Sequence, residues 1–323
     1  MRISASSIKT LNTCNFLFYY SYLLRGETFL SPKTVLGSCV HEVFEALSNK
    51  RHRHLVEELL NQSNPNVFTI TPLYKLVTKI LKRNKLTDKM WLKDANMLIV
   101  NGLREDFYQD KAISHFKAEH EFWIKEKDLE VRGFIDRAAI YPPTEKYPLG
   151  YVVCRDFKSQ KELFTKDELD FNIQALIYQW ALYRETGLPI FIEFVMLRHG
   201  IRQIVPWSSE DKIKGTISYL EYVSKYVNAF DIQKAKQNLA ADDPNKEWLC
   251  GKWAKAKDQL KKDGQPYFSC WARWPRTMYS VFKEDGDIKY TTDDPSSIKS
   301  DEWDNVKSFK FGGCPAFNHE SYK

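Results

Sequence analysis

The chain has 323 residues, of which 43% are hydrophobic and 28% charged, and 48 Lys and Arg against 42 Asp and Glu give a formal charge of +6. This composition excludes a disordered chain, and no apolar run reaches the roughly 20 residues of a membrane span, so we expect no membrane partner. The first residues lack the hydrophobic stretch of a secretory signal, which favours an intracellular protein. Six cysteines in such a protein are more typical of buried thiols or metal ligands than of disulfides.

The first third of the chain is predicted to be mainly helical. Apolar spacing indicates a helical segment over residues 4–26 and a second helix over residues 34–48. Residues 51–115 have the pattern of a helical insertion, broken at residues 64–66. The high lysine content of this insertion is typical of a solvated helix face.

The pattern changes near residue 116, where runs rich in Val, Ile, Phe and Tyr begin. The runs 118–124, 130–141 and 150–157 predict three strands joined by short links as an antiparallel meander. A helix is predicted over residues 171–186 and a further strand over residues 190–197. A helix between two strands of one sheet is a crossover connection. We therefore expect an α/β (α+β) fold with a mixed central sheet flanked by helices.

The composition shifts again beyond about residue 235, where five of the nine Trp and three of the six Cys lie. Regular periodicity fades there. We predict two domains on this basis. Residues 1–235 would form the core, including the N-terminal helices and the helical insertion at about 51–115. Residues 236–323 would form an irregular Cys/Trp-rich region packed back on the N-terminus.

Two acidic residues interrupt strands that otherwise look buried. Asp136 follows an apolar run, and Asp156 lies in another with Lys158 two positions later, on the same strand face. Two carboxylates on a rigid sheet suit Mg²⁺ or Mn²⁺, and a nearby ammonium can orient or deprotonate an attacking water, as phosphodiester hydrolysis requires. The alternative is a surface ion pair, although a buried unpaired charge would be costly.

Further polar candidates lie on predicted helices. Gln174 and Tyr178 share a helix face at i, i+4 and either support the lysine or bind phosphate, or form the polar edge of an ordinary amphipathic helix. His41 shares a face with Glu45. Its neutral imidazole would be a good third ligand to a carboxylate-bound metal, and the alternative is a core or capping histidine.

These residues occur in the order of a known set of motifs. The motifs are Ser-x-Ser followed by Cys14 and aromatics, Gly-x-x-x-His-x-x-x-Glu at 37–45, Gly-x-Ile-Asp-Arg at 133–137, Asp-x-Lys at 156–158 and Gln-x-x-x-Tyr at 174–178. The order resembles the PD-(D/E)XK nuclease superfamily over roughly residues 4 to 200. Within it, the pattern is similar to the branch that contains the RecB nuclease domain, the AddB nuclease and the CRISPR-associated Cas4 exonucleases.

The resemblance implies a restriction-endonuclease-like core and a role for each motif residue. The implied metal ligands are His41, Asp136 and Asp156. Lys158 would assist the attacking water, and Gln174 and Tyr178 would support the site. The family also has an acid on its first core strand, and both Glu119 and Glu121 have the required strand parity. A Pro-rich insertion at residues 141–148 departs from the family pattern, and a hairpin can absorb it.

The resemblance also implies a role for four cysteines. Iron–sulfur members of this branch use one N-terminal and three C-terminal cysteines. The matching positions are Cys14, Cys250, Cys270 and Cys314. The familiar Cys-x-x-Cys spacing is absent, so zinc or no metal are the alternatives to a [4Fe–4S] cluster. We expect Cys39 and Cys154 to be core residues.

The basic side chains that we expect to contact nucleic acid lie among tryptophans. They are Lys252, Lys255, Arg273 and Arg276. Basic residues would bind phosphates and aromatic rings could stack on unpaired bases, while the alternative is a solvated helix beside a Trp-rich core.

The whole pattern predicts a metal-dependent exonuclease acting on DNA ends or single-stranded DNA, in recombination, repair, replication or CRISPR-type processing. Its expected partners besides DNA are a helicase, an annealing protein or another recombination or CRISPR-adaptation component, in the cytoplasm or at the nucleoid, with a viral origin also open. The alternatives are a non-cutting nucleic-acid-binding subunit of a recombination complex and a sequence- or structure-specific endonuclease.

Overall fold

The computed structural model describes residues 1–27, 31–207, 209–251, 253–255, 259–260, 262 and 268–317. The chain divides into two compact units. We call them the terminal unit (Met1, Ile3–Phe29 and Lys225–Lys323) and the sheet unit (Arg2 and Leu30–Ser224). The N-terminal helices, which the sequence assigned to the core domain, therefore cluster with the C-terminal residues. Among the helices that the structure describes, none has both the length and the apolar character of a membrane span.

The sheet unit is built on a five-stranded mixed sheet with the order β1-β4-β5-β6-β7. Its strands are β1 (Ser114–His115), β4 (Arg137–Tyr141), β5 (Tyr151–Lys158), β6 (Ile190–Met196) and β7 (Ile201–Val205). β5 and β6 are parallel, and the other neighbouring pairs are antiparallel. The predicted mixed central sheet flanked by helices is confirmed.

The parallel pair requires a crossover connection. Two helices between β5 and β6 supply it, α7 (Lys166–Asp170) and α8 (Ile173–Thr186). The side chain of Asn172 caps α8 by accepting the backbone N–H of Ala175. Gly187, with a φ of +69°, ends the helix in the left-handed conformation that favours glycine. α8 packs on β6 and faces the side chain of Asp156.

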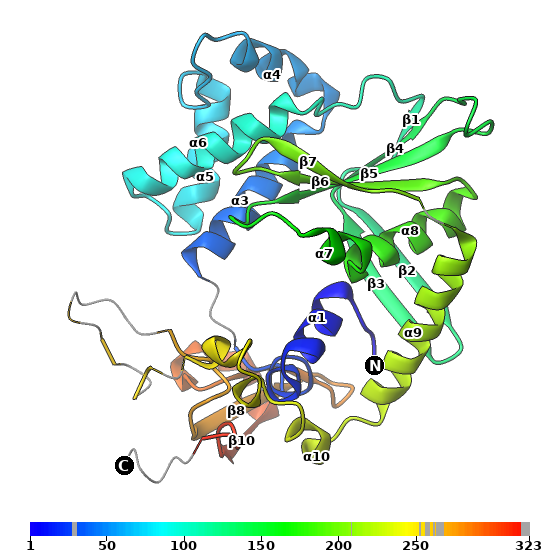
Figure 1. Cartoon of the computed structure of the whole chain (residues 1–323). Coiled ribbons are helices and arrows are strands. Elements are labelled where there is room, and N and C mark those ends of the chain that lie inside the picture. The colour runs from blue at the N-terminus through cyan, green and yellow to red at the C-terminus, as the bar shows by residue number, and fades with distance from the viewer. Residues whose placement is uncertain are drawn as a thin grey trace. The chain divides into compact units, whose positions relative to one another are not determined.

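The helical insertion packs with α3 into a separate layer (Figure 1). The layer contains α3 (Pro32–Leu47), the 3₁₀ turn η2 (Lys50–His52), α4 (Arg53–Leu60), α5 (Thr71–Arg83) and α6 (Lys89–Arg104). Ser31 caps α3 by accepting the backbone N–H of Thr34, and Pro32 occupies the first turn, where its missing N–H costs nothing. The apolar faces of these helices share one core with Phe157, Val195 and Leu197 of the sheet.

A β-hairpin adjoins the central sheet as a separate two-stranded sheet. It consists of β2 (His120–Glu126) and β3 (Leu129–Ile135), paired from His120·Ile135 to Glu126·Leu129. The predicted single strand 130–141 is interrupted by a bend at Asp136, so β3 pairs with β2 while β4 pairs with β5. The predicted three-strand meander is therefore split between two sheets at the position of a motif acid.

The terminal unit combines short helices with a small sheet. Its helices are α1 (Ala5–Thr13), α2 (Asn15–Phe18), the π-helical η1 (Tyr19–Leu23), the end of α9 (Glu210–Asn228), α10 (Ile232–Ala235), η3 (Ala240–Asp242), η4 (Glu247–Cys250), η5 (Pro295–Ser297) and η6 (Ser300–Asn305). β8 (Arg276–Phe282), β9 (Ile288–Thr292) and β10 (Val306–Phe311) form an antiparallel sheet of order β10-β8-β9 where the sequence predicted no regular elements. Gly26 forms a parallel bridge with Thr291, which joins the N-terminal segment to β9.

Candidate active site

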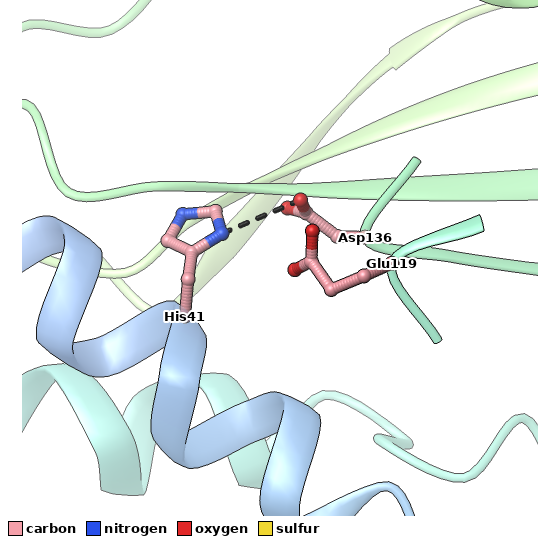
Figure 2. Close-up of side chains that lie close together, drawn as sticks. All are labelled: His41, Glu119 and Asp136. Atoms are coloured by element: carbon pink, nitrogen blue, oxygen red, sulfur yellow. Dashed lines mark ion pairs between the residues drawn. The ribbon is translucent and has the colours of Figure 1, made fainter. Parts of the chain in front are cut away.

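Three side chains with metal-ligand chemistry converge in the sheet unit. His41 on α3, Glu119 just before β2 and Asp136 at the bend after β3 place one ligand atom each within 4.8 Å of one another. Figure 2 shows the two carboxyl groups beside the imidazole, whose Nδ1 lies 3.3 Å from Asp136 Oδ1. A helix, a loop and a sheet bend thus contribute one donor each.

The orientation of His41 follows from its second ring nitrogen. Nε2 lies 2.9 Å from the backbone carbonyl of Phe157, which can only accept, so Nε2 carries a proton. Nδ1 then faces the Asp136 carboxylate, and a proton or a cation must lie between these two acceptors. Burial alone would lower the pKa of His41, but Asp136, assisted by Asp156 and Glu119, raises it to about 9 in the metal-free protein.

The structure separates the two glutamates between which the sequence could not decide. Glu119 lies outside the strand, with a φ of +52°, and its backbone N–H donates to the Asp136 carbonyl at 3.1 Å. Burial and the neighbouring Asp136 carboxylate raise the pKa of Glu119 to about 7. Glu121 is exposed and forms an ion pair with Arg132 on the hairpin. Glu119 is therefore the acid that joins His41 and Asp136.

The remaining motif residues form a hydrogen-bonded network on β5 and α8. Lys158 Nζ donates to Gln174 Oε1 at 2.7 Å and lies 2.6 Å from Asp156 Oδ2. Gln174 Nε2 donates to Asp156 Oδ1 and to the Tyr178 hydroxyl, both at 2.8 Å. Tyr178 in turn donates to the Phe134 carbonyl at 2.5 Å. All four predicted residues of this part of the site are brought together.

Asp156 lies in this network and outside the three-residue group, although the sequence placed it among the metal ligands. It is 3% exposed, and burial, opposed by the neighbouring Lys158, raises its pKa. Its Oδ2 is buried and forms the ion pair with Lys158. Both carboxylate oxygens of Asp156 therefore have a partner in this network, since Oδ1 accepts from Gln174.

The backbone of Phe157 joins the two groups. Its N–H donates to Asp136 Oδ2 at 2.8 Å, while its carbonyl accepts from His41. Residues 156 and 158 flank it on β5, so one strand positions both the three-residue group and the Asp156–Lys158 pair. The two contacts use the backbone of Phe157, which is the same for any non-proline residue, so motif spacing alone could not predict them.

The donor set fits a divalent cation. Carboxylate oxygens and an imidazole nitrogen suit Mg²⁺ and Mn²⁺. Burial, and then the negative charge of Asp136, raise the pKa of Glu119. His41, Glu119 and Asp136 therefore form a candidate site that could hold such a cation.

One comparison with known proteins identifies the family of this chain. The family model of the PD-(D/E)XK nuclease superfamily matches residues 2–270. The chain belongs to this superfamily. No curated protein matches the sequence. Among solved structures, a candidate exonuclease from Eubacterium rectale has 15% sequence identity and a TM-score of 0.43, and the alignment covers 70% of this chain and 80% of that one.

Four basic residues of this nuclease were predicted from the sequence to contact DNA. They differ in their surroundings. Arg273 is only 1% exposed and donates to a backbone carbonyl, and Arg276 forms an ion pair with Asp293 at 2.9 Å. Both guanidinium groups make contacts inside the terminal unit, and their contact with DNA stays a prediction. Lys255 is exposed, and Lys252 lies outside the described residues.

The six cysteines of the nuclease are divided between the two units. None of these six described cysteines forms a disulfide, and Cys39 and Cys154 are buried in the sheet unit. The other four lie in the terminal unit. The backbone N–H of Cys270 donates to the Cys250 carbonyl at 3.4 Å, and that of Cys314 donates to the Arg273 carbonyl at 2.9 Å. Burial raises the pKa of the Cys270 thiol to about 12, and Cys14, Cys250 and Cys314 are close enough to contribute to the rise.

Proposed function

We propose that this nuclease is a divalent-metal-dependent deoxyribonuclease that removes nucleotides from DNA ends or single strands. The observation that carries the proposal is the junction at Phe157, where the His41–Glu119–Asp136 group and the Asp156–Lys158 pair meet on one strand. A helicase or annealing protein stays the predicted partner.

A Mg²⁺ or Mn²⁺ ion held by His41, Glu119 and Asp136 would polarise the phosphodiester and lower the pKa of water. The protein contributes orientation. Phe157 keeps the proton of His41 on Nε2 and thereby presents Nδ1 to the site. To act as a ligand, Nδ1 must give up the proton that it holds in the metal-free protein, so cation binding and proton release are coupled.

Lys158 is positioned to act on the nucleophile or on the developing negative charge. Its ammonium is held between Asp156 and Gln174, and its side chain is 21% exposed, so the group is fixed but reachable. A fixed cation costs little reorganisation when charge develops on the phosphate. Gln174 and Tyr178 act as positioning residues, because their hydrogen bonds connect the lysine to the hairpin carbonyl of Phe134.

The test compares linear with covalently closed circular DNA in Mg²⁺ or Mn²⁺, with EDTA as the blank. An exonuclease degrades the linear substrate and leaves the circle intact. Cleavage of both would identify an endonuclease. Binding without cleavage of either, with a metal-loaded protein, would identify a non-cutting subunit.

We also propose that Cys14, Cys250, Cys270 and Cys314 bind an iron–sulfur cluster. Their support is the common location in the terminal unit and their mutual effect on pKa values. Among the described residues, no three of these sulfurs lie within 4.8 Å of one another. Zinc, which forms tetrahedral sites with thiolate ligands, stays the alternative occupant of the four cysteines.

The cluster is tested on protein purified without oxygen. Brown protein with iron and acid-labile sulfide, whose visible absorption bleaches on reduction, would support the proposal. Colourless protein with zinc would assign the cysteines to that metal, and protein with neither metal would remove the site.

A further inference from the structure

The outward face of the β2–β3 hairpin is unusual for a half-buried sheet. Its inward side chains are buried in the sheet unit, Val131 and Ile135 completely. The outward face carries Trp123 at 59% and Phe134 at 45% exposure, where an antiparallel sheet normally presents polar side chains to water. Two adjacent exposed rings are typical of a binding surface.

The register places this face close to the metal-site acids along the hairpin. Its cross-strand pairs are Glu121·Phe134, Trp123·Arg132 and Lys125·Glu130. The hydrogen bond from Glu119 N to Asp136 O adds one more pair at the end of the hairpin. Each step between such pairs is about 6.8 Å, so Phe134 lies one step from the acids and Trp123 two. Figure 1 shows the two paired strands running side by side.

Polar contacts hold the exposed rings in place. The guanidinium of Arg132 lies over both, 5.3 Å from the Phe134 centroid and 6.0 Å from that of Trp123. Arg132 also pairs with Glu121, and Trp123 Nε1 donates to Glu130 at 3.1 Å. These contacts fix the rings and leave more than two fifths of each exposed.

The charges of the face indicate what it contacts. Arg132 is neutralised by Glu121, and Lys125 lies opposite Glu130, so the face offers little net charge to phosphates. Exposed rings stabilised by a cation suit flat aromatic ligands, and every unpaired base has a π-face. The occupant that these features favour, given the continuity with the acids, is the bases of a single strand.

We propose that the outward face of this hairpin, named here the stacking face (Glu121, Trp123, Lys125, Glu130, Arg132 and Phe134), binds unpaired bases of single-stranded DNA and guides the strand to the acids. The proposal rests on the proposed nuclease function and adds to it a site and a substrate form. Base stacking carries the contact, and phosphate binding contributes little there.

The experiment measures binding by the full chain in EDTA, so that cleavage cannot interfere. The probes are a fluorescent dT oligonucleotide and an abasic strand of equal length, which keeps the phosphates and lacks the bases. We expect Trp123→Ala and Phe134→Ala each to weaken dT binding about tenfold, without changing abasic binding or the slope of affinity against salt. Trp123→Phe, which keeps a ring, should retain most of the affinity.

The matched control is Tyr74→Ala on α5, which removes an aromatic residue of similar exposure (47%) from the helical insertion. It should leave both affinities unchanged. Equal losses on dT and abasic strands, or none on either, would overturn the proposal. So would a wild-type dimer that Trp123→Ala converts to a monomer in sedimentation, because the face would then be an interface between copies.

The two proposals fail separately. If wild-type protein cleaves DNA but binds dT and abasic strands equally, the stacking face is refuted and the nuclease stands. If it prefers dT through Trp123 but never cleaves with metal, the nuclease function is refuted and the stacking face stands.

Discussion

The sheet unit and the terminal unit gather their metal-ligand side chains in different ways. In the sheet unit, the donors are His41, Glu119 and Asp136, which come from a helix, a turn and a sheet bend that a large core supports. In the terminal unit the four cysteines are far apart in sequence, and the segment between α10 and β8 has only short 3₁₀ turns among its described residues.

The difference indicates which of the two candidate metal sites would form without a metal and which would need one. Asp136 and Asp156 keep their positions through hydrogen bonds with the Phe157 backbone and with Gln174, respectively. The fold therefore positions these acids without a cation. In the terminal unit, burial raises the pKa of the Cys250 thiol to about 11 and that of the Cys314 thiol to about 12. A metal centre bound by the four cysteines would displace their thiol protons and close long loops. Metal binding would therefore stabilise the fold of the terminal unit.

The largest expected effect is loss of cleavage without loss of fold in the sheet unit. Asp136→Asn keeps an acceptor for the Phe157 N–H but removes a charged ligand, and Lys158→Ala removes the ammonium. We expect each to lower kcat by about 1,000-fold or more while Tm changes by less than about 4 °C. Nuclease assays and thermal unfolding measure the two quantities.

Asp128→Asn, an exposed acid in the hairpin turn, is the control and should keep full activity. Full activity of Asp136→Asn or Lys158→Ala would refute the catalytic assignment. Unfolding of both would show that the acid site, like the cysteine site, supports the fold, and the contrast between the units would be lost.

The opposite result is expected in the terminal unit. Cys270→Ser should reduce bound iron to background and raise amide exchange over residues 268–317 by about tenfold or more, because a cluster that closes the loops is lost. Metal analysis and hydrogen exchange measure these effects. Cys39→Ala in the sheet unit should leave iron unchanged. Retained iron in Cys270→Ser would contradict the proposed ligand set.

A moderate effect is expected from Tyr178→Phe. The change removes the hydroxyl that donates to the Phe134 carbonyl and accepts from Gln174, and leaves the ring packed against Phe122. We expect kcat to fall about tenfold and stability to fall by about 1–2 kcal/mol, since the Phe134 carbonyl loses its donor and Gln174 loses its acceptor. KM should change little. A change in KM alone would indicate that Tyr178 contacts the substrate and does not position Lys158.

The smallest expected effect is a pH dependence in the terminal unit. Hydrogen bonds from Lys289, and then from Tyr290, lower the pKa of Glu302 to about 2, from a usual 4.5. A lowered pKa means that the ionised carboxyl stabilises the fold above about pH 4.5 and loses this effect as pH falls towards 2. The Tm difference between wild type and Glu302→Gln should therefore shrink over that range.

Glu284→Gln, an exposed acid between β8 and β9, is the control for a general charge effect. A Tm difference for Glu302→Gln that is constant with pH would show that the charge of Glu302 does not stabilise the small sheet.

Much of the site could be predicted because strand and helix periods constrain side chains. Asp156 and Lys158 share a strand face, and Gln174 and Tyr178 share a helix face, and all four meet in the structure. The same reasoning failed to separate Glu119 from Glu121. Strand parity applies only inside a strand, and Glu119 lies before β2 in a left-handed conformation that no sequence period reveals.

The remaining differences have a common cause in long-range contacts. The bend at Asp136 divides a run that is uniformly strand-like in sequence, because β3 and β4 pair with different partners. Arg273 and Arg276 lie in a basic, Trp-rich segment, where tertiary packing buries the first and pairs the second with Asp293. Local composition does not predict which tertiary contacts an arginine side chain makes.

The two-residue connection of the hairpin has a consequence for engineering and for variant interpretation. Lys127 and Asp128 join Glu126 to Leu129, and Lys127 has a φ of +46°. This connection sets the register of every pair up to Glu119·Asp136, roughly 24 Å away by the rise of seven strand residues. A single-residue insertion there would misalign the acids without touching them. Such a variant would look like a catalytic mutant in an assay, although its lesion lies at the far end of the hairpin.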